Sequence, residues 1–532
     1  MKIIYLMLTF ITSFSTMSYA MITASIISDF TGEEILSQCL TMGPYLLGLG
    51  LGSIVGDRVE VKNSLKVLWR MEWMSVLFLP LIPLIHIVFI FGYIHLSDIG
   101  TTLESKASLK YILALASIMS FGTGLLGGSQ LPLIIRMIQD RVKAEVVLAA
   151  NYAGPLIAGP FIVYCNHLSL PASVQIVIVG LIQIVGLCLL MTFSEKRLLR
   201  MILLSLPLLI LIGVSKIYPK LEYLTVKASY IGTKIFQHDL EGLKTALKTI
   251  ENYGKLERVR TPYQVIDFFT VQAHPELQSP ANSTLYLNRK TQFDLYAVDV
   301  YHQSMIHAGL NLHSGKPQNI LILGAGDGLL LKELKSVAEI KSITMVELDD
   351  GIIKWSADHP IISKLNENVF DTPDSRVNLI VADAITYLRR HPADKTYDLV
   401  FIDFPFPNGH ELAKLYSKEF YSLVKKVTTP ESLVVIDLPV QRESDGTLTL
   451  ETQVILKTLK ETGFHNQLPF GPVASFIATK RSGKQLAFNY PSMSKNMTLA
   501  TRLNLVQMLD AEEVSRTEDH IPVNSMFWPR GL

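Results

Sequence analysis

The sequence predicts a bundle of six or seven transmembrane helices, followed by a small β-sheet and a doubly wound, Rossmann-like α/β domain. Three observations support this fold class. Long runs without a formal charge fill the first 215 or so residues, short β-like pieces follow near residue 260, and strands then alternate with helices. The predicted domains are a helical bundle (1–215), a helical linker (216–258), a small β part (259–312), and the α/β domain with its tail (313–532).

Composition limits the functions to be considered. At 532 residues the chain is too long for one ordinary domain. Its net charge of +1 provides no basic field, so we expect no nucleic-acid partner. The three cysteines, Cys39, Cys165 and Cys188, all lie in the apolar half, which favours neither a disulfide framework nor a metal site.

The helical bundle is predicted from seven uncharged runs. They cover residues 3–28, 35–56, 74–96, 111–135, 146–165, 172–193 and 201–215. The first six are long enough to span, because a hydrocarbon core of about 30 Å needs roughly 20 helical residues. The last has fifteen residues between Arg200 and Lys216, about 22 Å of helix, so its crossing is left open.

The interior of these runs indicates packing more than transport. We interpret Gly48, Gly50, Gly52, Gly122, Gly124, Gly127 and Gly128 as sites of close helix packing, with a substrate path as the alternative. No Asp, Glu, Lys or Arg stands in the middle of a run, so the usual signature of charge-coupled transport is missing. The apolar run continues past Ala20 to Ser28, which favours an uncleaved first helix over a signal peptide.

Orientation follows from the basic loops. These hold Arg58, Lys62, Lys66 and Arg70, then Arg136, Arg141 and Lys143, then Lys196, Arg197 and Arg200. The positive-inside rule places them in the cytoplasm, which predicts an inner-membrane protein in contact with the lipid bilayer. The α/β domain is then cytoplasmic if residues 201–215 stay in the interface, and external if they cross. We favour the cytoplasm because the run is short.

In the soluble half, acids follow the predicted strands NILILGAGDG, SITMVELD, RVNLIVAD and YDLVFIDFP. The first strand leads into a glycine turn formed by Gly324, Gly326 and Gly328, which permits close approach of a ligand. Glu347 ends the second strand, where an acid can accept both ribose hydroxyls. Asp383 can reach an adenine and Asp403 faces the substrate crevice, although acids are also common helix caps.

The glycine turn also holds Asp327. A carboxylate there would repel a pyrophosphate but attract a cationic sulfonium with an amino tail. The sequence therefore favours an S-adenosyl-type nucleotide over a dinucleotide.

Several segments occur in the order typical of one family. They are YQVI at 263–266, LYLNRKTQF at 285–293, YHQ at 301–303, LGAGDG at 323–328, VELD at 346–349, VADA at 381–384 and DFPFPNG at 403–409. With these segments the chain resembles the polyamine aminopropyltransferases, or spermidine synthases, and specifically their bacterial multi-pass membrane branch. The helical half is similar too, in GPYLLGLGLGS, GLLGGSQLPL and VLAANYAGPL.

The resemblance implies transfer of an aminopropyl group from decarboxylated S-adenosylmethionine, a co-substrate and not a bound cofactor, to an amine such as putrescine. Methylthioadenosine would be released. Tyr301 and His302 would line the amine site, and Asp403 would be the base that deprotonates the amine. The glycine turn and a set of other residues would bind the nucleotide: Gln264, Asp327, Glu347, Asp383 and Ala384.

The chain departs from the family pattern on the acceptor side. Phe406 replaces a second Asp, Ala297 and Val298 replace an Asp-Glu pair, Gln303 replaces a Glu, and Arg289 replaces a Gly. The acceptor amine, and any homo-oligomer, are therefore left open. Two other functions stay open as well: an S-adenosylmethionine-dependent amine methyltransferase, and a non-catalytic membrane sensor that binds the nucleotide.

Overall fold

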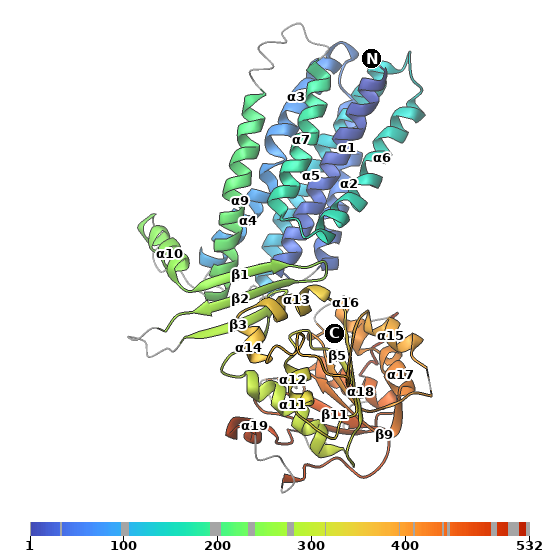
Figure 1. The fold of residues 1–532 in the computed structure, drawn as a ribbon. Coiled ribbons are helices and arrows are strands. Elements are labelled where there is room, and N and C mark those ends of the chain that lie inside the picture. Colours follow the sequence, from blue (N-terminus) through green and yellow to red (C-terminus); the bar gives the residue numbers. More distant parts are fainter. Residues whose placement is uncertain are drawn as a thin grey trace. The chain divides into compact units, whose positions relative to one another are not determined.

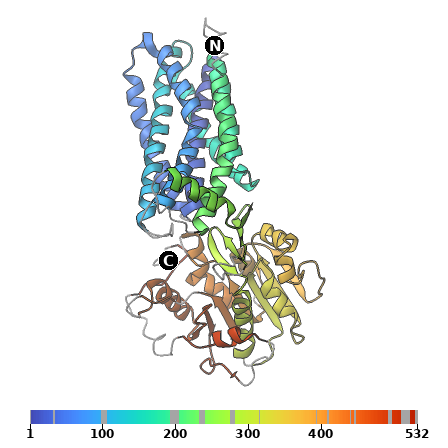
Figure 2. The same ribbon diagram turned by 90° about the vertical axis from the view of Figure 1, so that its left-hand side faces the viewer.

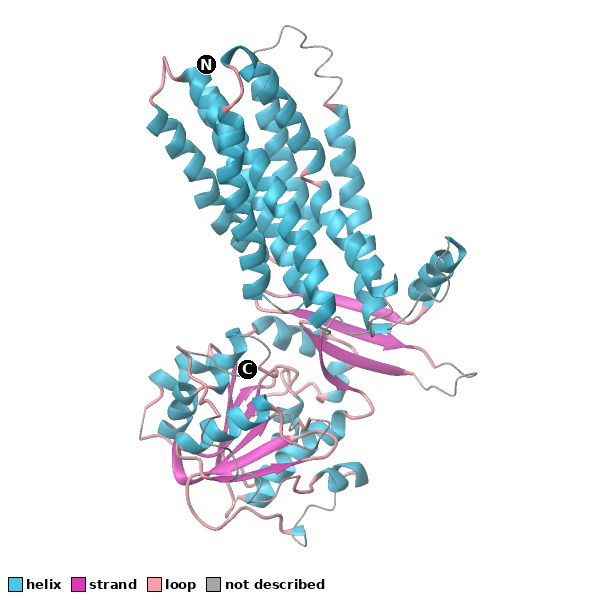
Figure 3. Ribbon diagram, turned by 180° about the vertical axis from the view of Figure 1, so that it is seen from behind, coloured by secondary structure: helices cyan, strands magenta, loops and turns pink. Residues whose placement is uncertain are grey.

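The computed structural model describes residues 2–527 except 32–33, 97–105, 192–203, 232–239, 274–280, 314, 393, 408–409, 439–440, 444–446, 491–496 and 509–520. The basic loop with Lys196, Arg197 and Arg200 lies outside the described residues. The chain divides into two compact units, residues 1–258 with 269–274, and residues 259–268 with 275–532. Among the described residues, all strands lie in the chain from Lys255 onward (Figure 3).

The first unit is a bundle of long helices that lie side by side (Figures 1 and 2). Its helices are α1 (Lys2–Thr31), α2 (Glu34–Asp57), α3 (Ser64–Phe78), α4 (Leu81–Leu96), α5 (Lys106–Ile138), α6 (Ala144–His167), α7 (Ala172–Met191), α9 (Ser205–Ile231) and α10 (Leu240–Asn252). Among the described residues, α1, α2, α5, α6 and α7 are long and apolar enough to cross a membrane. The pair α3 and α4, bent by 42°, would make a sixth span.

Two predicted boundaries differ from the observed helices. The uncharged run at 74–96 starts inside α3 and includes the break between α3 and α4 at residues 79–80. Counting charges could not predict this break, because it occurs at an uncharged residue, Pro80. Proline lacks the backbone N–H that a helix needs. The predicted linker boundary at residue 215 falls inside α9, which continues to Ile231. A lysine at position 216 ends an uncharged run without ending a helix.

Glycines bring α2 and α5 into backbone contact. A Cβ atom added at Gly48 or Gly52 would lie 2.2 or 2.3 Å from a carbonyl oxygen of α5. One added at Gly124 or Gly128 would lie 2.0 Å from a carbonyl oxygen of α2. The packing interpretation is confirmed for these four glycines.

A small antiparallel sheet opens the soluble half. Its strands, in spatial order, are β1 (Lys255–Arg260), β2 (Val265–Val271), β3 (Asn282–Leu287) and β4 (Lys290–Asp294). Asn288 and Arg289 form the turn between β3 and β4 with φ angles of +47° and +67°. A hairpin turn with two positive φ angles matches the right-handed twist of its strands. Glycine adopts a positive φ angle without strain, so it suits position 289 better than arginine.

The large sheet of the second unit has seven strands in the order β10-β11-β9-β8-β5-β6-β7. They are β5 (Asn319–Gly324), β6 (Ser342–Glu347), β7 (Val377–Val381), β8 (Tyr397–Asp403), β9 (Thr428–Asp437), β10 (Asn466–Phe470) and β11 (Phe476–Lys480). The five strands from β9 to β7 are parallel, whereas β11 is antiparallel to both of its neighbours, β9 and β10. The order reverses between β5 and β8, which makes that point the topological switch.

Helices cover both faces of this sheet. They are α11 (Val298–Leu312), α12 (Leu329–Lys335), α13 (Asp350–Asp358), α14 (Ile362–Leu365), α15 (Ala384–Arg390), α16 (His410–Ala413), α17 (Lys418–Lys426), α18 (Leu450–Glu461) and α19 (Leu499–Asn504). Alternate residues of β5 enter different cores, because side chains of a strand point to opposite faces: Ile320 and Ile322 pack with α11 and α12, whereas Leu321 and Leu323 pack with α15, α17 and α18. The predicted doubly wound α/β domain is therefore confirmed.

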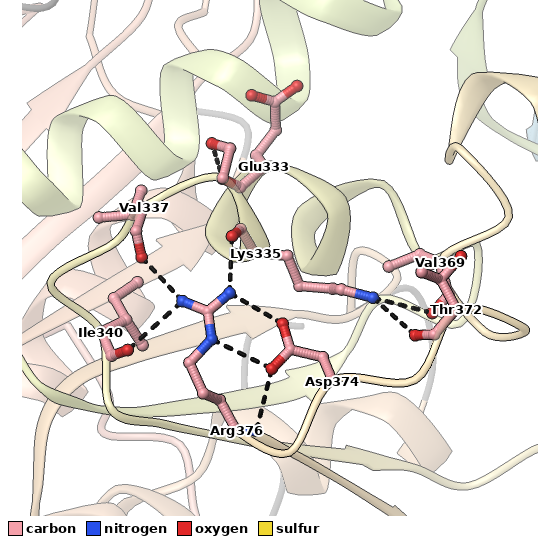
Figure 4. A network of polar contacts seen from close by, with 9 residues as sticks. Glu333, Lys335, Val337, Ile340, Val369, Thr372, Asp374 and Arg376 are labelled. Carbon is pink, nitrogen blue, oxygen red and sulfur yellow. Dashed lines mark hydrogen bonds and ion pairs between the residues drawn. The ribbon is translucent and has the colours of Figure 1, made fainter.

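A polar network ties the end of α12 to the segment before β7 (Figure 4). The Arg376 guanidinium donates to the Lys335 carbonyl at 2.7 Å and the Val337 carbonyl at 2.9 Å, and it pairs with Asp374 at 2.8 Å. The carbonyls at the end of a helix have no partner within the helix, so a guanidinium satisfies several of them at once. This network fixes the C-terminal end of α12, the helix that begins at the glycine turn.

Candidate active site

Strand ends gather acidic side chains at the switch point. Gly324 lies opposite Asp403 in the register of β5 and β8, and Ile402 lies opposite Ile436 in that of β8 and β9. Asp403 and Asp437 therefore end neighbouring parallel strands at the same level. In doubly wound sheets, ligands occupy the crevice at this edge.

The glycine turn has no room for side chains. Gly324 has a φ of +91°, and a Cβ atom there would lie 2.1 Å from the Asp403 carbonyl oxygen. Gly328 has a φ of +80° and stands at the start of α12. A Cβ atom on Gly326 would lie 3.1 Å from Glu347 Oε2. The turn thus brings bare backbone to the end of β6, as a closely approaching ligand requires.

The end of β6 carries two acids with different roles. Glu347 accepts a hydrogen bond from the Asp349 backbone N–H at 2.9 Å, and burial raises the pKa of Glu347 to about 7. Asp349 caps α13 and accepts hydrogen bonds from the Gln264 amide and the Thr261 hydroxyl, each at 2.7 Å. The structure thus places Gln264 beside the end of β6, held there by Asp349. Asp349 was missed, although it belongs to the VELD segment, because nothing in the sequence pairs it with Gln264.

Asp383 is the cap of a helix. Its Oδ1 accepts the Thr386 backbone N–H at 2.7 Å, and Ala384 is the buried first residue of α15. The capping interpretation therefore holds for this side chain. Its place after β7, next to the end of β6, leaves contact with an adenine as a prediction.

Helix α11 carries the two aromatic side chains of the site. The Tyr301 hydroxyl donates to Asp403 Oδ1 at 2.5 Å, and it is also hydrogen bonded to Asp437. His302 Nδ1 pairs with the Val298 carbonyl at 2.8 Å, which leaves Nε2 facing Asp327 Oδ2 at 3.5 Å. The predicted residues Tyr301, His302, Asp327 and Asp403 thus come together, and Asp437 joins them.

Buried charge sets the electrostatics of this cluster. Burial, followed by the Asp327 charge, raises the pKa of Asp403, and burial with the Asp403 charge raises the pKa of Asp437. Burial lowers the pKa of His302, but its contact with Asp327 outweighs burial, so the net shift is upward. Three acids that share one buried crevice favour a cationic ligand.

The departures from the family pattern have structural counterparts. Phe406 packs in the apolar core beside α15 and α17, and Val298 is buried in another apolar cluster. Gln303 accepts a hydrogen bond from the Thr501 hydroxyl at 3.2 Å. The Tyr416 hydroxyl bonds the carbonyl oxygens of Phe404 and Pro405 and so fixes the loop after Asp403.

Asp437 is a second candidate site residue that the sequence analysis missed. The segment SLVVIDLP has the pattern of a strand, and its acid occupies the same position within the strand as the acid of YDLVFIDFP. That equivalence was the available signal. The sequence does not show which strand lies next to β8, because the order of strands in the sheet is a property of the tertiary fold.

The fold and the acidic crevice define a doubly wound α/β domain built to receive a ligand that carries positive charge. Residues 298–478 match the family model described as "Spermine/spermidine synthase domain". This part of the chain therefore matches the domain of the spermidine synthases, the polyamine aminopropyltransferases, that its motifs predicted.

Curated relatives extend the likeness beyond that domain. The chain is 31% identical over 331 residues to polyamine aminopropyltransferase 1 of Streptomyces coelicolor, which covers 60% of this chain and 57% of that protein. It is 26% identical over 416 residues to the polyamine aminopropyltransferase of Oceanobacillus iheyensis, covering 77% of this chain and 72% of that one. Because residues 216–532 are about 60% of the sequence, this alignment reaches into the helical bundle.

A solved spermidine synthase in complex with the transition-state analogue AdoDATO superposes with a TM-score of 0.40 and 17% identity. The superposition covers 49% of this chain and 88% of that chain. No conclusion depends on a score this low.

Proposed function

We propose that this protein transfers an aminopropyl group from decarboxylated S-adenosylmethionine to an amine and releases methylthioadenosine. The observation that carries the proposal is the buried cluster at the switch point, in which Tyr301 contacts both Asp403 and Asp437. The family assignment supports the same reaction.

The nucleotide would lie over the glycine turn. Glu347 at the end of β6 would accept the ribose hydroxyls, and Asp327 would attract the positively charged aminopropyl side. Gln264, fixed by Asp349, would complete this side of the site. Asp383 with Ala384, next along the sheet edge, would border the adenine.

The acceptor would bind across Tyr301. An amine with a pKa of about 10 is protonated at neutral pH and has no free lone pair. Asp403 would take a proton from it, because burial and Asp327 raise the pKa of Asp403 and make it a stronger base than an exposed aspartate. The amine nitrogen would then attack the carbon beside the sulfonium, the C–S bond would break, and methylthioadenosine would leave with the bonding electrons.

Asp437 would hold a positively charged amine of the acceptor. It stands at the level of Asp403 on the neighbouring strand and shares Tyr301 with it. An acid at this position would compensate for Phe406, which presents no charge. The acceptor class is therefore an amine with a second cationic group, and putrescine fits this description.

The helical bundle would anchor the enzyme in the inner membrane, with the α/β domain in the cytoplasm where nucleotides are made. Five described helices, or six with the bent pair, are suited to span a bilayer, and α9 is not among them. Membrane fractionation combined with protease protection of intact cells tests this arrangement. Cleavage of the α/β domain from outside the cell would refute the cytoplasmic placement.

Product analysis tests the reaction. Purified protein is given decarboxylated S-adenosylmethionine, S-adenosylmethionine and a panel of mono- and diamines, and the products are identified by mass spectrometry. Methylthioadenosine together with an amine enlarged by an aminopropyl group is the expected result. A methylated amine would refute the proposal in favour of a methyltransferase, and nucleotide binding without any product would indicate a sensor.

A further inference from the structure

A layer of polar side chains crosses the interior of the helical bundle. Glu72 of α3 is 1% exposed, and its Oε1 accepts a hydrogen bond from the Thr12 hydroxyl of α1 at 2.6 Å. Ser75, one turn further along α3, accepts a hydrogen bond from the Gln130 amide of α5 at 3.4 Å. Polar contacts thus join three helices at one level.

Helix α7 contributes to the same level. A Cβ atom added at Gly180 would lie 3.2 Å from the Tyr19 hydroxyl, and one added at Gly186 would lie 3.0 Å from Ile11. Gln183 stands midway between these glycines and is fully buried. It therefore lies level with the stretch of α1 between Ile11 and Tyr19, the stretch that contains Thr12 and Ser15.

Several atoms of this layer have no hydrogen-bond partner among the described residues. They are Gln130 Oε1, both side-chain polar atoms of Gln183, and Ser15 Oγ. Each buried polar atom left unsatisfied costs about 1–3 kcal/mol, so they are exceptional in native proteins. They occur at the level of a buried acid, which indicates that this layer receives an occupant.

The charge of Glu72 identifies the class of occupant. Its hydrogen-bond donor is the neutral Thr12 hydroxyl, and among the described residues no lysine or arginine forms an ion pair with it. A bare carboxylate costs several kcal/mol in an apolar interior. Glu72 therefore carries a proton or faces a cation. Glu72 was not predicted from the sequence, because this acid precedes the uncharged run at 74–96 and so counted as a flanking charge, although it lies within α3.

We propose that this layer is a binding site for a small monovalent cation, either an alkali ion or the ammonium end of an amine. Glu72 supplies the negative charge, and Gln130, Gln183 and Ser15 supply neutral oxygen atoms. Binding exchanges one positive charge for another, because the cation enters as the Glu72 carboxyl releases its proton. The 42° bend between α3 and α4 follows soon after Glu72. Broken helices recur at ion sites of membrane proteins, because they interrupt the regular backbone beside the site.

The experiment uses the full chain in detergent and dicyclohexylcarbodiimide, an apolar reagent that adds to protonated carboxyl groups. Peptide mass spectrometry measures the rate at which Glu72 is modified at one fixed pH, in sodium chloride, potassium chloride or diaminobutane, each against choline. We expect a Glu72 adduct in choline and at least a tenfold slower reaction with one of the three cations. The protecting cation identifies the occupant.

Two variants serve as controls. Glu60→Gln, an exposed acid, should leave the modification and its protection unchanged. The double variant Q130L/Q183L should keep the Glu72 adduct but lose the protection, and it remains informative if Glu72→Gln does not fold. Modification at one rate in every salt would overturn the proposal and make Glu72 a protonated structural acid. Absence of modification in choline would overturn it as well. Neither result bears on aminopropyl transfer.

Discussion

The substitution Asp437→Asn tests the acidic cluster most directly. It keeps the shape of the side chain but removes the charge that stands level with Asp403. A charge-assisted hydrogen bond contributes about 1.5–3 kcal/mol. In Asp437→Asn, the hydrogen bond between this carboxylate and the non-reacting ammonium group of a diamine loses that contribution. Because about 1.36 kcal/mol corresponds to a factor of ten, the acceptor KM should rise roughly 10- to 150-fold. The KM for the nucleotide should stay within twofold.

The pH profile of the same variant provides a second measurement. Burial and the Asp403 charge raise the pKa of Asp437 well above its ordinary range, because two like charges repel across a buried crevice. The Asp437 carboxylate therefore becomes available to an ammonium group only as the pH rises through this raised pKa, and the acceptor KM of the parent should fall over that range. In Asp437→Asn this pH dependence of the acceptor KM should disappear.

Steady-state kinetics with varied diamine, from about pH 5 to pH 9, measures both effects. Asp371→Asn is the matched control, because that carboxyl is exposed on the surface. An acceptor KM in the variant that equals that of the parent and keeps its pH dependence would refute the role of Asp437. A lower kcat alone would place Asp437 in the chemical step and not in acceptor binding.

Variants at three further positions have expected outcomes. Asp403→Asn should reduce kcat by about 10²–10⁴-fold and leave nucleotide affinity by calorimetry unchanged; full activity would exclude Asp403 as the base. Arg289→Gly should raise stability by about 1 kcal/mol, because an L-residue at φ +67° is strained, and a lower unfolding midpoint would contradict this. Arg376→Ala should lower the free energy of unfolding by about 3 kcal/mol, measured by thermal unfolding, because several carbonyl oxygens lose their donor. Arg376→Lys should lie between Arg376→Ala and the parent, because lysine keeps the charge but lacks the planar guanidinium group. Equal loss in both variants would show that the guanidinium geometry is not needed.

The sequence by itself determined the fold class and most of the strand-end acids. Long uncharged runs, short apolar strands that alternate with helices, and glycines after the first strand are local patterns, so Gly324, Glu347 and Asp403 could be placed at strand ends without coordinates. The family motifs lie in the same local segments. Tyr301 and His302 were assigned by resemblance, and their contacts could not be predicted from spacing.

The tertiary structure decided which acids meet. Asp437 lies 34 residues beyond Asp403 in the chain but ends the adjacent strand, because the sheet order places β9 beside β8. Glu72 appears as a flanking charge in the sequence but is buried in the bundle, because α3 packs there against α1 and α5. Local pattern fixes which way a side chain points on its own element. Its neighbours depend on long-range packing and strand order, which no local pattern encodes.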